Sequence, residues 1–298
     1  MKQNSVTDVV GIIGAGAWGS AIAQLVARSG ARVILWSFDG KYETFGLKET
    51  SYKNIIVTQD MHDLYSYGCT VWIAVTPAEF FRKTMERTKE FYNKQPIIIC
   101  TKGAEPKTGK FMTEVLRETI RPSKNRIGVL SGPQFAGEVA RGIPTGSTLA
   151  GGKKIREIGQ RIFKGLFLSP TRDVIGTEIC GVGKNAVSII SGYIKVKGNG
   201  ENESALYMTN AWKEIIKLGL RMGAKLETFS DLCGIGDLLL TATSTTSRNF
   251  SAGVAIAKGE KPVGTVEGLS ALHALSARAK KYNVHTPLLF NMAQKFSK

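Results

Sequence analysis

The feature that most constrains this chain is a set of three glycines where an apolar run passes into an amphipathic one. Gly14, Gly16 and Gly19 stand in the sequence VVGIIGAGAWGSAIAQLVA. Val9 to Ile13 predict a buried strand, and the residues after the glycines have the period of a helix. In that context Gly14 allows a tight turn, Gly16 lets a pyrophosphate approach the backbone, and Gly19 lets the helix pack closely on the sheet. The positive end of the helix would face the phosphates, so the sequence predicts a dinucleotide-binding site.

The pattern up to about Gly176 predicts a doubly wound parallel sheet of the Rossmann type with right-handed crossovers, an α/β fold. Short β-branched runs alternate with helical segments there. The expected strands are Val9–Ile13, Arg32–Trp36, Thr70–Val75, Ile97–Thr101, Arg126–Leu130 and Arg172–Ile175. The expected helices are Trp18–Arg28, Pro77–Phe91 and Lys110–Ile120.

After Glu178 alanine-rich amphipathic segments replace the β-branched runs, which predicts an all-helical second domain. Glu203 to Met222 form one helix in this reading, with Gly223 as its stop, and Pro287 begins a last helix. The stretch from Thr241 to Ser247 is polar and predicts a loop. We therefore expect a dinucleotide-binding domain over residues 1–177 and a helical substrate domain over residues 178–298.

Composition predicts a cytoplasmic protein without a membrane segment. No run reaches the roughly 18 apolar residues of a membrane span, and Asp8 and Gly11 interrupt the first candidate for a signal peptide. The four cysteines have no metal-site or disulfide spacing, so we expect buried free thiols and no metal. The net charge of +16 is spread along the chain without a basic arm, so we expect no nucleic-acid partner. Only three histidines are present, so lysine has to be considered for proton transfer.

Several polar residues follow the expected strands or interrupt apolar helices. Lys102 follows the fourth strand on a glycine-containing turn, and Gly132 follows the fifth; both would face the crevice at the carboxyl ends of the strands. In the second domain Lys184 and Asn185 interrupt an apolar helix, Asp237 and Thr241 share a helix face, and a loop carries Ser247, Arg248 and Asn249. Each also has an ordinary structural explanation: Lys184 can extend to solvent, Asp237 can cap a helix, and Arg248 can be a surface charge.

These segments, taken in order, resemble the bacterial-type NAD(P)-dependent glycerol-3-phosphate dehydrogenase family. The matching blocks are GAGAWG, VTPAEF, TKGAE, SGPQFAGEVA, CGVGKN, GIGDLLLTAT, SRN and VEG, and they span nearly the whole chain. The resemblance implies Lys184 as the proton-transfer residue, with Asp237 as the buried acid beside it and Lys102 shared between the substrate and cofactor sites.

The resemblance also implies the remaining site residues. The substrate-binding set is Lys102, Gly132, Gln134, Asn185, Thr241, Ser247, Arg248 and Asn249. The cofactor-binding set is Gly14, Gly16, Ala17, Trp18, Gly19, Ser37, Phe38, Lys102, Ala136, Arg248 and Glu267.

The implied reaction is reversible hydride transfer between NAD(P)H and dihydroxyacetone phosphate, giving sn-glycerol 3-phosphate for glycerophospholipid synthesis. Ser37 ends the second strand where NAD enzymes often carry an acid, and Asp39 and Lys41 nearby have opposite charges, so NAD and NADP both stay open with a slight preference for NAD. We also expect a homodimer.

The sequence leaves two alternative functions open. One is another lysine-dependent dehydrogenase of the β-hydroxyacid type, such as a ketopantoate reductase or a 3-hydroxyacyl dehydrogenase, against which Lys102 and the SRN segment argue. The other is a catalytically silent nucleotide sensor, or a basic RNA-binding module that retains the fold. Aromatic residues do not cluster among the basic ones, which disfavours RNA.

Overall fold

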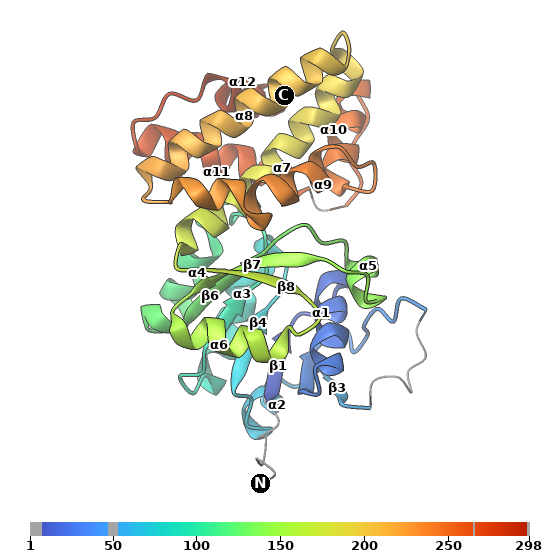
Figure 1. Cartoon of the computed structure of the whole chain (residues 1–298), viewed down its shortest axis with the longest axis vertical. Coiled ribbons are helices and arrows are strands. Elements are labelled where there is room, and N and C mark those ends of the chain that lie inside the picture. The colour runs from blue at the N-terminus through green and yellow to red at the C-terminus, as the bar shows by residue number, and fades with distance from the viewer. Residues whose placement is uncertain (1–7, 47–52, 265, 297–298) are drawn as a thin grey trace. The chain divides into compact units, whose positions relative to one another are not determined.

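A computed structural model describes residues 8–46, 53–264 and 266–296 of the chain. They form two compact units (Figure 1). The first comprises residues 1–101, 116–130 and 134–172, and the second comprises residues 102–115, 131–133 and 173–298. The main division therefore falls between Arg172 and Asp173, five residues before the expected one, and two short segments from the sheet half of the sequence belong to the helical unit.

The first unit is built on an eight-stranded sheet of order β3-β2-β1-β4-β5-β6-β7-β8. The pairs β3–β2, β2–β1, β1–β4, β4–β5, β5–β6 and β7–β8 are parallel. The strands are β1 Val9–Ile13, β2 Arg32–Trp36, β3 Ile55–Thr58, β4 Val71–Ala74, β5 Ile97–Ile99, β6 Ile127–Ser131, β7 Gly146–Gly151 and β8 Phe167–Thr171. The central residues of β1, β2 and β4 to β7 are almost wholly buried, as in a parallel sheet covered on both faces, whereas the edge strands β3 and β8 are partly exposed.

Helices flank this sheet in Figure 1. Helix α1 packs against β1 and β2 and also contacts α5, while α6 packs against β7. The helices are α1 Ala17–Arg28, α2 Asp63–Ser66, α3 Ala78–Thr88, α5 Ala136–Ala140 and α6 Lys153–Ile162, with the 3-10 turns η2 Lys89–Phe91 and η3 Lys124–Arg126. Helix α4, Met112–Thr119, has its first turn in the second unit.

The second unit is organised around the buried helix α7, which α8, α9, α10 and α11 contact. Its helices are α7 Val174–Lys197, α8 Glu201–Arg221, α9 Asp237–Ala242, α10 Arg248–Lys258, α11 Glu267–Lys281 and α12 Pro287–Lys295. The 3-10 helix η4 Leu226–Ser230 and the π-helix η5 Leu232–Gly236 precede α9. None of the described helices is both long and apolar enough to span a lipid bilayer.

The prediction of a Rossmann-type sheet followed by a helical part is confirmed, but several of its details are wrong. The strand expected at Arg172–Ile175 does not exist, because the Asp173 carboxylate caps helix α7 by accepting a hydrogen bond from the Gly176 N–H at 2.8 Å. The loop expected to carry Arg248 and Asn249 is the first turn of α10, whose N-cap is Ser247. The loop expected from Thr241 also begins late, since α9 continues to Ala242. The strand list of the prediction also lacks β3, β7 and β8.

Candidate active site

The glycine turn after β1 has the geometry that the motif predicts. Gly14 has a φ of +117°, and a Cβ on Gly19 would lie 1.9 Å from the Gly14 carbonyl oxygen, so both positions require glycine. A Cβ on Gly16 would meet no described atom within 4 Å, which leaves open space in front of the turn. Gly16 is the N-cap of α1 and offers no side chain to cap it, so first-turn amides remain available to an anion.

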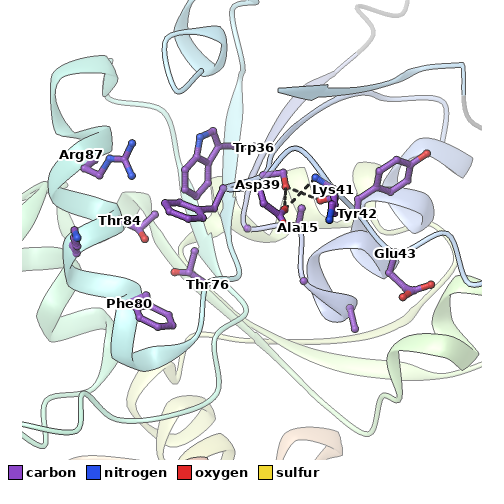
Figure 2. Close-up of a pocket in the computed structure, with 16 residues that line it drawn as sticks. Ala15, Trp36, Asp39, Lys41, Tyr42, Glu43, Thr76, Phe80, Thr84 and Arg87 are labelled. Carbon is purple, nitrogen blue, oxygen red and sulfur yellow. Dashed lines mark hydrogen bonds between the residues drawn. The ribbon is translucent and has the colours of Figure 1, made fainter. Parts of the chain in front are cut away.

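This turn opens into a cavity of about 740 Å³ in the first unit (Figure 2). Gly14, Gly16, Ala17, Ser37 and Phe38 of the predicted cofactor set line it, while Trp18 and Gly19 do not. The predicted cofactor set lacks the lining residues Ala15, Trp36, Tyr42, Glu43, Thr76, Phe80, Lys83, Thr84 and Arg87. Most come from the end of β2 and from α3, and periodicity alone does not reveal that these elements face one another.

The end of β2 presents an acidic group to this cavity. Ser37 is buried, and its hydroxyl donates to the backbone oxygen of Lys41 at 2.6 Å and lies 3.1 Å from Oδ1 of Asp39. The backbone N–H of Lys41 also donates to Oδ1 of Asp39 at 3.1 Å. These bonds lower the pKa of Asp39, the bond from the Lys41 backbone most of all. Figure 2 shows Asp39 across the cavity from Thr84 and Arg87 of α3.

The cavity fits an adenine dinucleotide by two independent observations. Its volume is in the usual range for a small-molecule site. The hydroxyl of Thr76, which lines it, is buried and has no hydrogen-bond partner among the described residues. An unpaired buried hydroxyl is costly, so a polar ligand group would relieve it.

The second unit gathers the predicted catalytic residues around one buried carboxylate. Asp237 begins α9 and is fully buried. The Lys184 ammonium, on α7, donates to its Oδ1 at 2.7 Å, and the Lys102 ammonium donates to its Oδ2 at 2.9 Å. Lys184 also donates to the Thr241 hydroxyl at 3.0 Å, and Lys102 to the Gly132 carbonyl at 2.7 Å. Five of the predicted residues therefore lie in one connected cluster.

Burial and neighbouring charges set the protonation of Lys184. Desolvation lowers its pKa from 10.5 to about 8, although Asp237 and Glu267 oppose this effect. The Lys102 charge lowers the pKa of Lys184 further. An amine with a pKa near 8 can both give and accept a proton near neutral pH.

A second polar group joins this cluster to α10 and α11. The Asn185 amide donates to the backbone oxygen of Lys102 at 3.0 Å and to Oε2 of Glu267 at 3.2 Å. The Asn249 amide donates to Oδ1 of Asn185 at 2.9 Å and accepts from the Gly268 N–H at 2.9 Å. Burial raises the pKa of Glu267, while the Arg248, Lys184 and Lys102 charges lower it.

The remaining predicted residues lie at the start of α10 or in the first unit. Arg248 is exposed, whereas Ser247 is buried with its hydroxyl 3.1 Å from that of Ser188. Gln134 and Ala136 belong to the first unit. Both polar atoms of the Gln134 amide are buried without a partner among the described residues, so this amide is available to a ligand.

The chain matches both halves of one enzyme family. Residues 9–155 match the model of the NAD-dependent glycerol-3-phosphate dehydrogenase N-terminus, and residues 173–296 match that of the C-terminus. A glycerol-3-phosphate dehydrogenase (NAD(P)+) of Maricaulis maris is 36% identical, over 94% of this chain and 89% of that protein. The corresponding protein of Caulobacter vibrioides is 34% identical, over 94% of this chain and 90% of that protein.

Solved structures give the same result. The crystal structure of glycerol-3-phosphate dehydrogenase from Coxiella burnetii has a TM-score of 0.84 and 29% identity, covering 95% of this chain and 93% of that one. A ketopantoate reductase from Ralstonia eutropha has a TM-score of 0.63 at 14% identity, covering 96% of each chain, which shows a shared fold alone.

Proposed function

Because the chain belongs to the NAD-dependent glycerol-3-phosphate dehydrogenase family, we propose that it reversibly reduces dihydroxyacetone phosphate to sn-glycerol 3-phosphate with NAD(P)H. The observation that carries the proposal is the buried Lys184–Asp237 pair, with Lys102 on the second oxygen of the same carboxylate. Membership of this family also argues against a ketopantoate reductase or a silent nucleotide sensor.

Lys184 is the proposed proton donor and acceptor. When bound, the reduced nicotinamide supplies the hydride, and negative charge then develops on the ketone oxygen. The Lys184 ammonium stabilises that charge and gives the oxygen its proton; in oxidation the neutral amine accepts the hydroxyl proton. Asp237 holds the Lys184 ammonium in place and offsets part of the cost of burying it.

Lys102 is proposed to complete the charge balance. Two ammonium groups share one carboxylate, so the Lys102–Lys184–Asp237 group carries one net positive charge when both lysines are protonated. That excess positive charge suits an anionic substrate and a developing alkoxide.

The phosphate of the substrate is assigned to the start of α10. Arg248 is exposed there, at the N-terminus of a helix, and its guanidinium can hold two phosphate oxygens at once. Because the phosphate is remote from the reacting carbon, its binding energy can hold the ketone in a reactive position.

NAD is the proposed preferred cofactor. Asp39 lines the cavity and keeps its charge, since its pKa is lowered, and its Oδ2 is able to accept a ribose hydroxyl. The same carboxylate would repel the 2′-phosphate of NADP.

We also propose a cytoplasmic homodimer that supplies glycerol 3-phosphate for phospholipid synthesis. The four cysteines are buried and free, which suits a reducing compartment. Light scattering measures the mass in solution and thereby tests the dimer.

The activity is tested by following NADH and NADPH oxidation with dihydroxyacetone phosphate, in the wild type and in Lys184→Met. We expect turnover in the wild type, and in the variant loss of turnover with unchanged NADH affinity by calorimetry. Lys195→Met, a change to an exposed lysine on the same helix, is the matched control. A wild type that oxidises neither cofactor would refute the proposed function, and equal loss of affinity and turnover would give Lys184 a structural role only.

A further inference from the structure

The segment that carries Lys102 is fastened to helix α7 at two places. At its start the Asn185 amide donates to the backbone oxygen of Lys102 at 3.0 Å. At its end Glu178 accepts from the Thr113 N–H at 2.8 Å and from the Thr113 hydroxyl at 2.6 Å. Glu178 and Asn185 are two helical turns apart and therefore lie on one face of α7.

Between these two points the helix backbone lies close to the Lys102 side chain. A Cβ added to Gly181 would be 3.7 Å from both Cβ and Cγ of Lys102. Lys102 thus rests against α7 along its stem while its ammonium reaches Asp237. Its position depends on how the segment is held on the helix.

Arg278 of α11 holds the middle of the same segment. Its guanidinium donates to the Gly109 carbonyl at 3.0 Å, pairs with the Glu114 carboxylate, and lies 3.7 Å from the centre of the Phe111 ring. The segment also closes on itself through a bridge between Ala104 and Phe111. These contacts make the segment one folded piece, so a change at Thr113 is transmitted towards Lys102.

We propose that Glu178 is a positioning residue for Lys102: by holding Thr113 at the start of α4, it keeps the Lys102 segment on α7 and the Lys102 ammonium on Oδ2 of Asp237. This inference rests on the proposed function, because the consequence of the positioning is the charge balance around Lys184. Glu178 itself bonds to neither Lys102 nor Lys184, and acts through the segment.

The positioning has an electrostatic consequence that can be measured. The charged groups that act on Lys184 are Asp237, Lys102 and Glu267. If the Lys102 ammonium moves away from Asp237, a positive charge that repels the Lys184 ammonium is removed. The Asp237 carboxylate then interacts with Lys184 alone of the two lysines. Both changes favour the ammonium, so the pKa of Lys184 rises.

The two hydrogen bonds between Thr113 and Glu178 do not require a charged Glu178. Burial raises the pKa of Glu178 to about 7, with Glu114 adding to the shift and the Thr113 hydrogen bonds and Arg278 opposing it. A protonated carboxyl still accepts from the Thr113 N–H through one oxygen and can donate to the Thr113 hydroxyl through the other. A glutamine offers the same pair of groups, so Glu178→Gln should preserve the position of the segment.

The chain provides a matched control in Glu214 of α8. This buried carboxylate also holds the start of a helix, accepting from the Leu288 and Leu289 N–H groups of α12 at 3.0 and 2.9 Å. It bonds to no residue of the Lys102 segment in the described part of the chain. Loss of either carboxylate should destabilise the fold in a similar way, and only the loss of Glu178 should affect Lys102.

The experiment compares Glu178→Ala, Glu178→Gln, Thr113→Ala and Glu214→Ala. The first measurement is amide hydrogen exchange of residues 103–113 by mass spectrometry, which needs no activity. We expect exchange at least about tenfold faster in Glu178→Ala, a smaller increase in Thr113→Ala, and wild-type exchange in Glu178→Gln and Glu214→Ala.

The second measurement is the pH profile of kcat/KM for ketone reduction. In Glu178→Ala we expect roughly ten- to hundredfold lower kcat and an alkaline limb displaced to higher pH, and in Glu178→Gln a near-wild-type profile. The proposal would be overturned if Glu178→Ala had the same kcat and the same alkaline limb of the pH profile as Glu214→Ala. Wild-type hydrogen exchange of residues 103–113 in Glu178→Ala would also overturn it. If the wild type reduces no ketone, the proposed function fails separately and the exchange result alone decides the positioning.

Discussion

Lys102 and Lys184 donate to different oxygens of a single carboxylate, Oδ2 and Oδ1 of Asp237, at 2.9 and 2.7 Å. Their sequence positions are 82 residues apart (184 − 102), yet both ammonium groups lie in the same helical unit. Because one negative charge serves two cations, neither lysine is fully compensated. The local surplus of positive charge is what the proposed reaction requires for an anionic substrate and a developing alkoxide.

The direction of the reaction should determine the sign of its pH dependence. Reduction needs the Lys184 ammonium and oxidation needs the neutral amine, and burial lowers the pKa of Lys184 to about 8. We therefore expect kcat/KM for ketone reduction to fall as pH rises through about 8, and kcat/KM for alcohol oxidation to rise over the same range. Initial rates in both directions between pH 6 and 10, roughly two units on either side, measure this. Parallel profiles in the two directions would contradict the assigned role of Lys184.

Arg248→Ala should weaken the handling of the phosphorylated substrate specifically. Hydrogen bonds to charged groups contribute about 1.5–3 kcal/mol, so we expect kcat/KM for dihydroxyacetone phosphate to fall roughly a hundredfold. The rate with unphosphorylated dihydroxyacetone, where measurable, should change little. Arg221→Ala, at an exposed position near the end of α8, is the control. A rate constant that barely changes in Arg248→Ala would mean that the phosphate binds elsewhere.

Asp39→Ala should move cofactor preference towards NADP. The substitution removes the carboxylate that is proposed to bind the ribose and leaves the cations Lys41, Lys83 and Arg87 on the same cavity. We expect the ratio of NADPH to NADH affinity to rise by roughly tenfold, because the negative charge that repels a 2′-phosphate is gone. Titration with adenosine 2′,5′-bisphosphate and with AMP measures the change without catalysis. An unchanged ratio would remove Asp39 from cofactor selection.

The two glycines of the turn should respond differently to alanine. In Gly19→Ala the new Cβ would lie 1.9 Å from the Gly14 oxygen, so we expect a loss of stability of about 1–3 kcal/mol or more. In Gly16→Ala the new Cβ meets no described atom within 4 Å, so stability should be kept while NADH affinity falls. Urea unfolding and calorimetry separate these effects. Equal cofactor affinity in Gly16→Ala and the wild type would place the pyrophosphate away from this turn.

The local parts of the fold were predictable wherever a short stretch of sequence carries its own physical signal. The strand Val9–Ile13, the glycine turn, the stop at Gly223 and the start at Pro287 agree with the structure because each depends on neighbours within a few residues. The strand expected at Arg172–Ile175 is absent for a reason that is also local. Val174 and Ile175 are β-branched and favour a strand, but Asp173 caps helix α7, and these two residues form its first turn. The polar run that suggests a loop at Arg248 and Asn249 is instead the start of α10, because the Ser247 side chain caps this helix by accepting from the Phe250 N–H.

The sequence by itself determined that a Rossmann-type sheet precedes a helical part, the glycine geometry and, through family resemblance, which residues to consider at the site. Only the tertiary structure decided that Lys102 belongs to the helical unit, that Asp237 accepts from both lysines, and that Glu178 accepts from Thr113. The physical reason is that hydrogen bonds between distant residues leave no periodicity in the sequence, since Glu178 and Thr113 are 65 positions apart. A buried carboxylate must find donors somewhere in the fold, and which donors it finds depends on how the segments pack.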